Sequence, residues 1–479
     1  MNKKLIIVTV CKLLLLEIAL MLLCMVVSLI YKDGCIWAYI ESIAAISAVA
    51  VPVLLFVKPS INTLYFKEAV AVAGLDWIFI SIFGCLPLVF SRVCGFSDAF
   101  FEIASGFTTT GATIFGDVES LPESINFLRC FTHWVGGVGV LVLTTAVLPS
   151  SDNTSARLTR AESTGPSYSK LMPKSGDNSK VLYIIYGVIT LALIISLRIC
   201  GMNLFDSILH GLSTAGTGGF SNKAASVGQY NNVAAEIVIG VFMMLFGISF
   251  GVYFKVIAGE YKTAFKNEEL IVYLSVTALA VLLIAFNIKG MVGGFGNALR
   301  QSFFQVTSIS STTGFSTADF DLWPGFSKAI LVLLMFIGSC AGSTAGGLKV
   351  IRVILLCKIA SREVNKYYAP RQIRAIRLDG KSVPEDMLNH IAAYFIVFMF
   401  TLTAGSLCLI LSGCDLLSAV TGSLACVSNI GPGLNMLGPT CNFGFLPGAS
   451  KLFMALIMIA GRLEFYPIFM LAIPSAWRK

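Results

Sequence analysis

Four short stretches, rich in hydroxyl side chains and glycine, interrupt a very hydrophobic chain. They occupy residues 108–113, 217–221, 311–316 and 428–433. Each follows an apolar run of about ten to thirteen residues, whereas a helix needs about 20 residues to cross a hydrocarbon core. Irregular backbone is tolerated at membrane depth only where it lines water or is buried in protein. The pattern therefore predicts four re-entrant loops, each preceded by a half-crossing helix.

The residue types in these stretches suit the binding of a dehydrated cation. Glycine permits the unusual dihedral angles that turn successive carbonyl oxygens inward, and threonine adds a hydroxyl oxygen. The half-helix directs the partial negative charge of its C-terminus toward the same place. No carboxylate occurs within the four stretches, so selection by charged rings is disfavoured. Any one stretch alone could be a small-residue packing motif, but four equivalent ones favour a cation-conducting pore with four-loop selectivity.

Composition places the chain among polytopic membrane proteins. Of its 479 residues, 56% are hydrophobic and 13% are charged, about half the charge of an ordinary soluble domain. The net charge of +8 resides largely in loops between apolar runs, which indicates membrane topology rather than a nucleic-acid partner. Three dispersed histidines do not favour a histidine metal site. The first apolar run continues to about residue 30 without a clear cleavage site, so we expect a retained helix rather than a signal peptide.

The order of apolar runs predicts four pseudo-repeats after a peripheral unit of two helices. The expected units are the two helices at 1–58, pore repeats at 59–150, 181–266, 267–362 and 388–479, and cytoplasmic loops at 151–180 and 363–387. The expected full helices are 5–30, 36–57, 68–91, 126–149, 181–200, 233–257, 269–288, one from about 326, 388–411 and 450–473, and the half-helices are 98–107, 206–214, 297–310 and 415–427. Asp98 and Asp206 are the expected N-caps of the first two half-helices, and Asp415 begins the fourth.

This order predicts ten crossings in an all-α polytopic fold, with four helix–pore loop–helix units around one pore. When the N-terminus is placed in the cytoplasm, the loops rich in Lys and Arg all fall on the cytoplasmic side, as the positive-inside bias requires. Both termini are then cytoplasmic, and the four re-entrant loops open toward the outside.

Two further features lie inside expected spans. The stretch 338–347 is rich in glycine and small residues, and each glycine weakens a helix by about 1 kcal/mol relative to alanine. Its free carbonyls could line water below the filter, or Gly338 and Gly342 could mediate close helix packing. Arg462 falls near the centre of the last span. It could be an electrostatic barrier beneath the filter, or it could pair with Glu464 or with carbonyls of the interrupted helix.

Several motifs along the chain match those of one known family. They are 108–112, 217–221, 312–315, 429–433, His133–Gly137, 342–349 and 461–464. With these motifs the chain resembles the TrkH/KtrB superfamily of potassium-uptake proteins, and the two extra N-terminal helices favour its TrkH branch. The resemblance implies K⁺ as the transported ion, a homodimer with one pore per subunit, a bacterial inner-membrane location, and control by a cytoplasmic nucleotide-binding ring of the TrkA type.

The resemblance also implies roles for particular residues. The ion would meet Thr109, Thr110, Gly111, Thr217, Gly218, Gly219, Thr312, Thr313, Gly314, Asn429, Ile430 and Gly431. A mobile intramembrane gate would comprise Gly338, Gly342, Ser343, Thr344, Gly346, Gly347 and Lys349. Arg462 would shape the electrostatics of the pore. Each of the four filter stretches would form one quarter of the ring around the ion. Gly218 stands where the first and third repeats have threonine, so the second quarter lacks that hydroxyl.

Three function classes compete at this point. A gated potassium pore fits four repeats of one orientation, whereas carriers usually show inverted repeats or two parallel halves. A H⁺- or Na⁺-coupled potassium symporter would need an intramembrane carboxylate, for which Glu102, Glu236 and Glu464 are candidates. An intramembrane enzyme lacks a paired acid, histidine–metal or nucleophile–base constellation within the spans. We expect the pore, with no cofactor of its own and with nucleotide control supplied by a partner.

Overall fold

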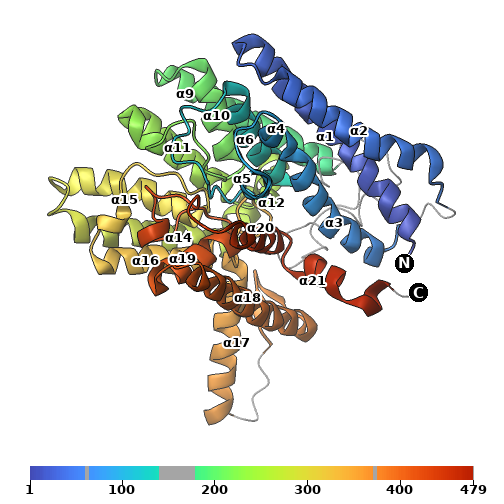
Figure 1. Cartoon of the computed structure of the whole chain (residues 1–479). Helices are drawn as coiled ribbons and strands as arrows, with labels where there is room; N and C mark the ends of the chain where they lie inside the picture. Colours follow the sequence, from blue (N-terminus) through green and yellow to red (C-terminus); the bar gives the residue numbers. More distant parts are fainter. Residues whose placement is uncertain (60–63, 140–177, 370–374, 478–479) are drawn as a thin grey trace.

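The fold is described from a computed structural model, which covers residues 1–59, 64–139, 178–369 and 375–477. It is almost entirely helical, as expected (Figure 1). Within these residues, six helices or helix pairs are long and apolar enough to cross a membrane, or seven if one sharply bent pair is a single span. The six are α1 (Lys3–Tyr31), α2 (Ile36–Phe56), α3 (Phe66–Gly84) with α4 (Leu86–Phe90), α9 (Asn178–Ile199), α14 (Glu268–Ile288) and α18 (Glu385–Leu411).

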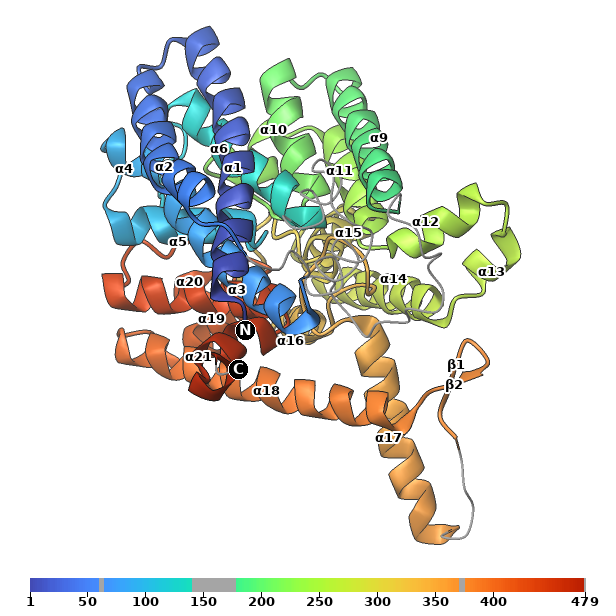
Figure 2. The ribbon, with the colours of Figure 1, turned by 90° about the vertical axis from the view of Figure 1, so that its right-hand side faces the viewer.

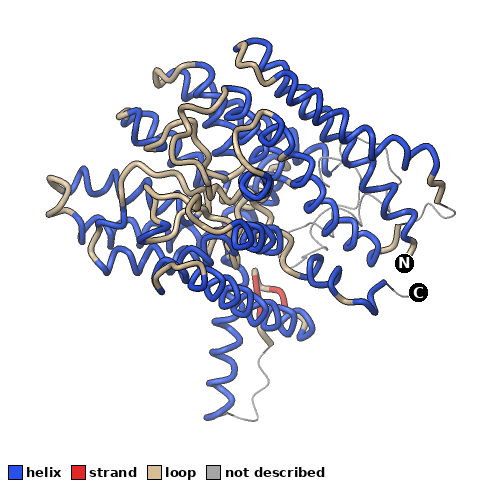
Figure 3. The backbone as a smooth tube through the Cα atoms, in the orientation of Figure 1, coloured by secondary structure: helices blue, strands red, loops and turns tan. Residues whose placement is uncertain are grey.

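Four shorter helices and the loops after them confirm the repeated helix–pore loop–helix architecture. The half-helices are α5 (Phe96–Phe107), α10 (Leu204–Ala215), α15 (Phe295–Ser310) and α19 (Leu416–Val427). The second helices of the repeats begin with α6 (Glu123–Val138), α11 (Val233–Phe246), α16 (Gly325–Ile337) and α20 (Gly448–Arg462). Short 3₁₀ turns occur at Ser226–Tyr230, Phe320–Leu322, Asn435–Leu437 and Pro474–Trp477. Figure 3 shows that the irregular segments gather in the middle of the molecule, among the helices.

The prediction of one continuous helix over 233–257 is wrong. The chain bends by 88° between α11 and α12 (Phe250–Ile257). The break exposes backbone groups that pair with the interrupted region of the third repeat. The carbonyl of Gly247 accepts a hydrogen bond from the N–H of Cys340 (3.1 Å), and the N–H of Phe250 donates to the carbonyl of Gly342 (2.8 Å). Two breaks in different repeats therefore satisfy each other's backbone, as buried polar groups require.

Two other predicted helices are also divided. The helix expected at 450–473 ends with α20, and α21 (Tyr466–Ala472) follows after Glu464 and Phe465 adopt φ values of 58° and 67°. Arg462 consequently lies at the end of α20, not near the centre of a continuous span. The helix expected at 68–91 divides at Cys85. Pro87 explains this break, because proline lacks an N–H and its ring clashes with the carbonyl four residues earlier.

Both expected N-caps are wrong, whereas the acidic residue that begins the fourth half-helix does cap it. Asp415 caps α19, accepting from the N–H groups of the next turn at 3.2 and 3.3 Å. Asp98 lies inside the first turn of α5 and instead pairs with Lys451 at 2.6 Å. Asp206 also lies inside its helix, where its N–H donates to the true cap, Asn203, at 2.7 Å. The spacing of thirteen residues between each of these two aspartates and its filter glycine thus marked the first turn of the half-helix, but not the residue that caps it.

Two basic segments, at 151–180 and 363–387, were expected to be loops. Residues 363–387 are not a continuous loop, because α17 (Val350–Tyr368) extends into them and β1 (Arg377–Leu378) pairs antiparallel with β2 (Lys381–Ser382). Figure 2 shows α17 projecting from the rest of the molecule, with this hairpin beside it. The end of the helix expected at 126–149 and most of the loop expected at 151–180 lie outside the described residues.

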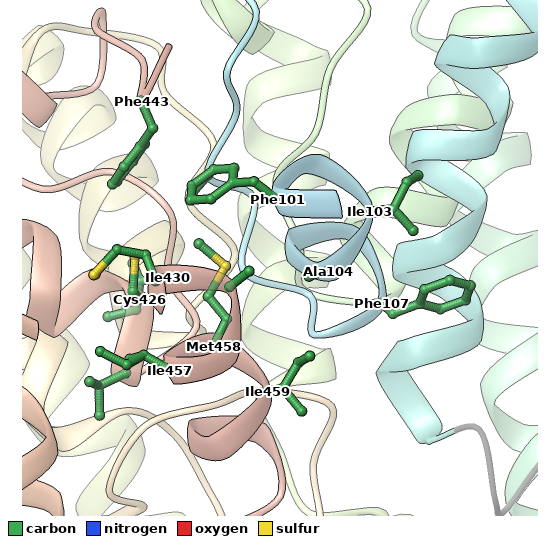
Figure 4. Close-up of a cluster of buried hydrophobic side chains, with 14 of the residues drawn as sticks. Phe101, Ile103, Ala104, Phe107, Cys426, Ile430, Phe443, Ile457, Met458 and Ile459 are labelled. Carbon is green, nitrogen blue, oxygen red and sulfur yellow. The ribbon is translucent and has the colours of Figure 1, made fainter. Parts of the chain in front are cut away.

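Packing between the first and fourth repeats brings together segments that are about 350 residues apart in the sequence. α5 packs against α20, and Figure 4 shows side chains of both repeats meeting in one apolar cluster. Phe101 of α5 faces Phe443 with ring centroids 5.4 Å apart, and Met458 of α20 is fully buried in the same cluster. α5 also packs against α6, and α6 against α10. The half-helices therefore surround a common centre, while α1 and α2 lie together at one side (Figure 1).

Candidate functional site

The chain leaves all four half-helices through the same backbone turn. In the first quarter, the N–H groups of Thr108, Thr109 and Thr110 donate to the carbonyls of Ala104, Gly106 and Ser105, at 2.9, 3.0 and 2.8 Å. Equivalent triplets of hydrogen bonds start from residues 216–218, 311–313 and 428–430. Four sequences that share few identities thus adopt one local structure, which is strong structural support for the repeat.

Two positions in each quarter have positive φ. The first is non-glycine and has φ values of 56°, 54°, 57° and 54° at Thr109, Thr217, Thr312 and Asn429. The second is glycine throughout, with φ values of 78°, 82°, 82° and 98° at Gly111, Gly219, Gly314 and Gly431. Left-handed threonine costs free energy and persists only where the surroundings enforce it. The sequence pattern had singled out all eight residues, and the structure gives them matching backbones.

The four quarters form a closed ring through the glycines of the predicted filter. A Cβ atom added to Gly111 would lie 1.9 Å from the carbonyl oxygen of Gly218, which belongs to the next quarter. The same test places Gly219 against the carbonyl of Thr313 at 2.1 Å, Gly314 against that of Ile430 at 2.1 Å, and Gly431 against that of Thr110 at 2.7 Å. Around the ring, the first quarter therefore contacts the second, the second the third, the third the fourth, and the fourth the first. Each glycine is therefore required by contact as well as by φ.

The polar atoms around this ring include oxygens that lack donors. The ring threonines are fully buried, namely Thr109, Thr110, Thr217, Thr312 and Thr313. Thr109 Oγ1 and Asn429 Oδ1 have no hydrogen-bond partner among the described residues. In contrast, Thr110 Oγ1 bonds to Thr108 Oγ1 (2.8 Å) and accepts from Asn429 Nδ2 (2.9 Å). Buried oxygens without donors are costly, and a desolvated cation is the kind of group that they could coordinate.

The second quarter differs from the others because His133 occupies the space of a side chain. A Cβ atom at Gly218 would lie 2.1 Å from His133 Nδ1 and 2.2 Å from its Cγ. The imidazole is held by Ser213 Oγ, 3.0 Å from Nδ1, and stacks on Phe220 with centroids 4.2 Å apart. The missing threonine noted in the sequence therefore has a steric cause, supplied by α6 of the first repeat.

The predicted gate residues form an irregular loop between α16 and α17 that touches the filter. The N–H of Gly346 donates to Thr312 Oγ1 at 2.8 Å. A Cβ atom at Gly346 would lie 2.3 Å from the carbonyl oxygen of Ser428. This loop, residues 338–349, which we call the intramembrane loop, thus contacts the third and fourth quarters directly.

Both ends of the intramembrane loop are held by Glu269, which the sequence reading missed. This buried carboxylate of α14 accepts from the N–H of Ala341 at 2.7 Å and from that of Ile351 at 3.2 Å. The N–H of Val350 also donates to the carbonyl of Ser339 at 3.0 Å. No local motif marks Glu269, because its partners lie about 70 to 80 residues later.

Basic side chains surround the same loop. Arg462 donates to the carbonyl of Thr344 (2.7 Å) and to those of Gly136 and Gly137 (2.8 and 2.6 Å). These contacts match the carbonyl pairing that the sequence offered as one alternative for Arg462. The ammonium of the fully buried Lys349 donates to the carbonyl of Ala345.

Glu464 forms an ion pair with Arg352 of α17. Its carboxylate lies 2.5 Å from Arg352 Nη2, and the Arg352 guanidinium also lies over the ring of Tyr394 at 3.8 Å. Arg352 is the third residue of α17 and therefore lies just after the loop. This ion pair ties the start of α17 to the segment between α20 and α21.

A second buried ion pair lies behind the first filter quarter. Glu102 of α5 and Arg129 of α6 are 2.8 Å apart and almost completely buried. The sequence offered Glu102 only as a candidate coupling carboxylate of a carrier. In the structure it accepts from the hydroxyl of Thr113 at 2.9 Å and from the N–H of Ile114 at 2.9 Å.

Comparisons with known proteins agree on one family. The sequence matches the TrkH family, described as cation transport proteins, over residues 38–289 and 270–479. The Trk system potassium uptake protein TrkH of Salmonella typhimurium is 33% identical over 459 residues, which cover 95% of each chain. TrkG of Escherichia coli, also a Trk system potassium uptake protein, is 33% identical over 463 residues, covering 95% of this chain and 94% of TrkG.

A solved structure shows the same architecture. The crystal structure of the potassium transporter TrkH from Vibrio parahaemolyticus superposes with a TM-score of 0.90 at 30% sequence identity, covering 100% of both chains. The matched family comprises membrane cation transporters, not enzymes. With the family pattern, the relatives and the superposition all spanning nearly the whole sequence, the chain belongs to the TrkH family of cation transport proteins.

Proposed function

We propose that this protein takes up K⁺ by conducting it through the ring of the four filter quarters. The closed ring of filter glycines and neighbouring carbonyls carries the proposal. Backbone carbonyls can replace the hydration shell of a monovalent cation, and no carboxylate occurs in the four stretches to favour a divalent ion. Relatives of this family are potassium uptake proteins, which supports K⁺ as the ion.

The intramembrane loop is the gate in this proposal. It lies against the third and fourth quarters through Gly346, and it carries the positive charge of Lys349. Arg462 holds the carbonyl of Thr344 in the same loop. A cation leaving the filter inward would meet these charges in a region of low dielectric, where repulsion is strong. Conduction then requires the loop and its basic residues to move aside.

The moving force would come from a cytoplasmic nucleotide-binding partner of the TrkA type. The relatives are named as parts of a Trk system, and α17, which directly follows the intramembrane loop, projects from the rest of the molecule with the hairpin beside it, where a partner could reach it. The proposal includes a homodimer in a bacterial inner membrane, ten crossings and cytoplasmic termini. The positive-inside distribution of Lys and Arg supports this orientation.

A second candidate function is a H⁺- or Na⁺-coupled potassium symporter, favoured by one observation. Glu17 of α1 is only 2% exposed, and neither of its carboxylate oxygens has a hydrogen-bond partner among the described residues. It lines a small cavity of about 10 Å³ beside Phe107 and Thr132. An intramembrane carboxylate of this kind is a natural proton-binding group. Glu17 is not one of the three candidate coupling carboxylates predicted from the sequence.

Rubidium uptake into potassium-loaded proteoliposomes separates the two functions. For a pore, external K⁺ blocks uptake, Na⁺ does not, and Gly314→Ser abolishes this preference, because its Cβ would lie 2.1 Å from the carbonyl of Ile430. Gly325→Ser is the matched control, since nothing lies within 4 Å of a Cβ there. Uptake that requires a proton or sodium gradient and ignores Gly314→Ser would instead establish the symporter.

A further inference from the structure

One equivalent position on each half-helix faces the filter from behind. It lies nine residues before the filter glycine, and its four occupants are Glu102, His210, Gln305 and Gly422. The three side chains are polar and fully buried. Burying such groups is costly unless they are hydrogen-bonded. Their partners therefore indicate what the position does. In each quarter we call the residues that follow the filter glycine the outer arm: 112–114, 220–222, 315–318 and 432–434.

In the first quarter, Glu102 holds the outer arm by two hydrogen bonds. Its carboxylate accepts from Thr113 Oγ1 at 2.9 Å and from the N–H of Ile114 at 2.9 Å. Arg129 neutralises the carboxylate through an Nε–Oε1 contact of 2.8 Å. Arg129 also donates to the carbonyl of Ser221 at 3.3 Å, so the brace of the first quarter reaches the outer arm of the second.

In the second quarter, His210 performs the same task with an imidazole. Nδ1 lies 2.9 Å from the carbonyl oxygen of Asp206. A carbonyl can only accept, so Nδ1 must carry the hydrogen, and Nε2 of the neutral ring is then an acceptor. Ser221 Oγ lies 3.0 Å from Nε2 and donates to it, while accepting from the N–H of Lys223 at 3.0 Å.

In the third quarter the brace is an amide, and in the fourth it is replaced by direct packing. Gln305 Nε2 donates to the carbonyl of Ala318 at 3.2 Å. Gly422 has no side chain, and the outer arm closes onto the half-helix instead. A Cβ atom at Gly433 would lie 3.0 Å from the nitrogen of Gly422. The N–H of Leu434 donates to Thr421 Oγ1, one residue earlier on the same helix, at 3.0 Å.

We propose that Glu102, His210 and Gln305 are positioning residues that set the width of the filter, and with it the discrimination of K⁺ from Na⁺. The inference rests on the proposed function and names the residues that hold its filter in shape. Inward-pointing carbonyls repel one another, and a ring held only at its half-helices could narrow around the smaller ion. Bracing each outer arm from behind fixes the separation of the oxygens. Because a carboxylate, an imidazole and an amide differ in strength, the quarters resist deformation unequally.

Two variants of α15 test the proposal with a matched control. Gln305→Met removes the bracing amide, nearly keeps the side-chain volume and leaves no unpaired charge. Gln301→Met makes the same chemical change one turn earlier, at a partly exposed position. The assay is rubidium uptake into proteoliposomes, with K⁺ or Na⁺ as external competitor. We expect Gln305→Met to lower the preference for K⁺ over Na⁺ by about fivefold, the factor that corresponds to one ordinary hydrogen bond, and Gln301→Met to leave it unchanged.

A second variant and a reference variant make the result decisive. Ser221→Ala removes the oxygen that His210 binds and is a small change, so it serves if Gln305→Met does not fold. A purely structural role would reduce protein yield or melting temperature while leaving the K⁺/Na⁺ preference intact, and that outcome in both variants would overturn the proposal. Gly314→Ser is run beside them. If it also leaves the preference intact, the filter assignment itself fails. If it alone abolishes the preference, the filter stands and only the bracing inference falls.

Discussion

Restoring the missing threonine of the second quarter should destabilise the protein for a steric reason, and removing the side chain that blocks it should offset part of this loss. In Gly218→Thr, the new Cβ would lie 2.1, 2.2 and 2.4 Å from three ring atoms of His133. The ring cannot yield easily, since Ser213 holds its Nδ1 and Phe220 stacks on its face. Overpacking of this kind costs about 1–3 kcal/mol, occasionally more.

The change that removes the blocking side chain is His133→Ala, which empties the space that the threonine needs. Alone it should also destabilise the protein, by about 2–5 kcal/mol, as other large-to-small core substitutions do. In the double variant the new side chain of residue 218 fills part of that space. The two effects are therefore expected to be non-additive by about 1–3 kcal/mol, within the range measured for residues in contact.

The assay is the melting temperature of detergent-purified protein, followed for the wild type, both single variants and the double variant. The double variant should melt above the temperature expected if the losses of the two single variants simply added. Gly290→Thr provides the matched control, because nothing lies within 4 Å of a Cβ at that position and His133→Ala should not rescue it. Strict additivity at residues 133 and 218 would refute the steric account of the second quarter.

Two further predictions concern carboxylates that hold segments together. Glu269→Leu removes the acceptor of both ends of the intramembrane loop and should raise partner-free rubidium uptake by about tenfold, the factor for one charge-assisted hydrogen bond. Glu41→Leu, at an exposed position of α2, is the control, and unchanged uptake in Glu269→Leu would count against the loop as gate. Burial acts to raise the pKa of Asp33, but hydrogen bonds from Ser124 and others outweigh it and hold this pKa below its usual value. The stability from Asp33 is therefore present above its unfolded pKa of about 3.9 and is lost as pH falls through the lower folded pKa. Asp33→Asn should lower the melting temperature at pH 7 and converge with the wild type in acid, whereas a pH-independent difference would exclude this origin.

The repeated architecture was predictable because its signals are local. Short apolar runs followed by glycine and hydroxyl residues marked every half-helix, and the filter glycines fell where the backbone requires positive φ. Helix breaks were less visible. The break at Gly247 is stabilised by hydrogen bonds to Cys340 and Gly342, almost 100 residues away, so nothing in its immediate sequence distinguishes it from an ordinary glycine within an apolar helix.

The supporting residues could not have been found from types alone. Glu102 looked like a candidate coupling group because a carboxylate in a span is costly, yet its environment supplies Arg129 and two further donors. His210 and Gln305 carried no signal as isolated residues. Aligning the four repeats on their filter glycines would have placed them at one position, which is the periodic signal that the sequence did contain.

Fourfold pseudo-symmetry in a single chain has a physical consequence that a ring of four identical subunits lacks. Identical quarters must respond alike to an ion or to a gate, whereas here Thr312 bonds to the intramembrane loop and Gly218 packs against His133. A displacement of the loop therefore acts first on the third and fourth quarters. The first and second, joined by Arg129 to the carbonyl of Ser221, can keep their shape meanwhile. In the proposed mechanism, divergence of the repeats thus allows one part of the ring to be coupled to gating while another preserves the geometry on which selectivity would depend.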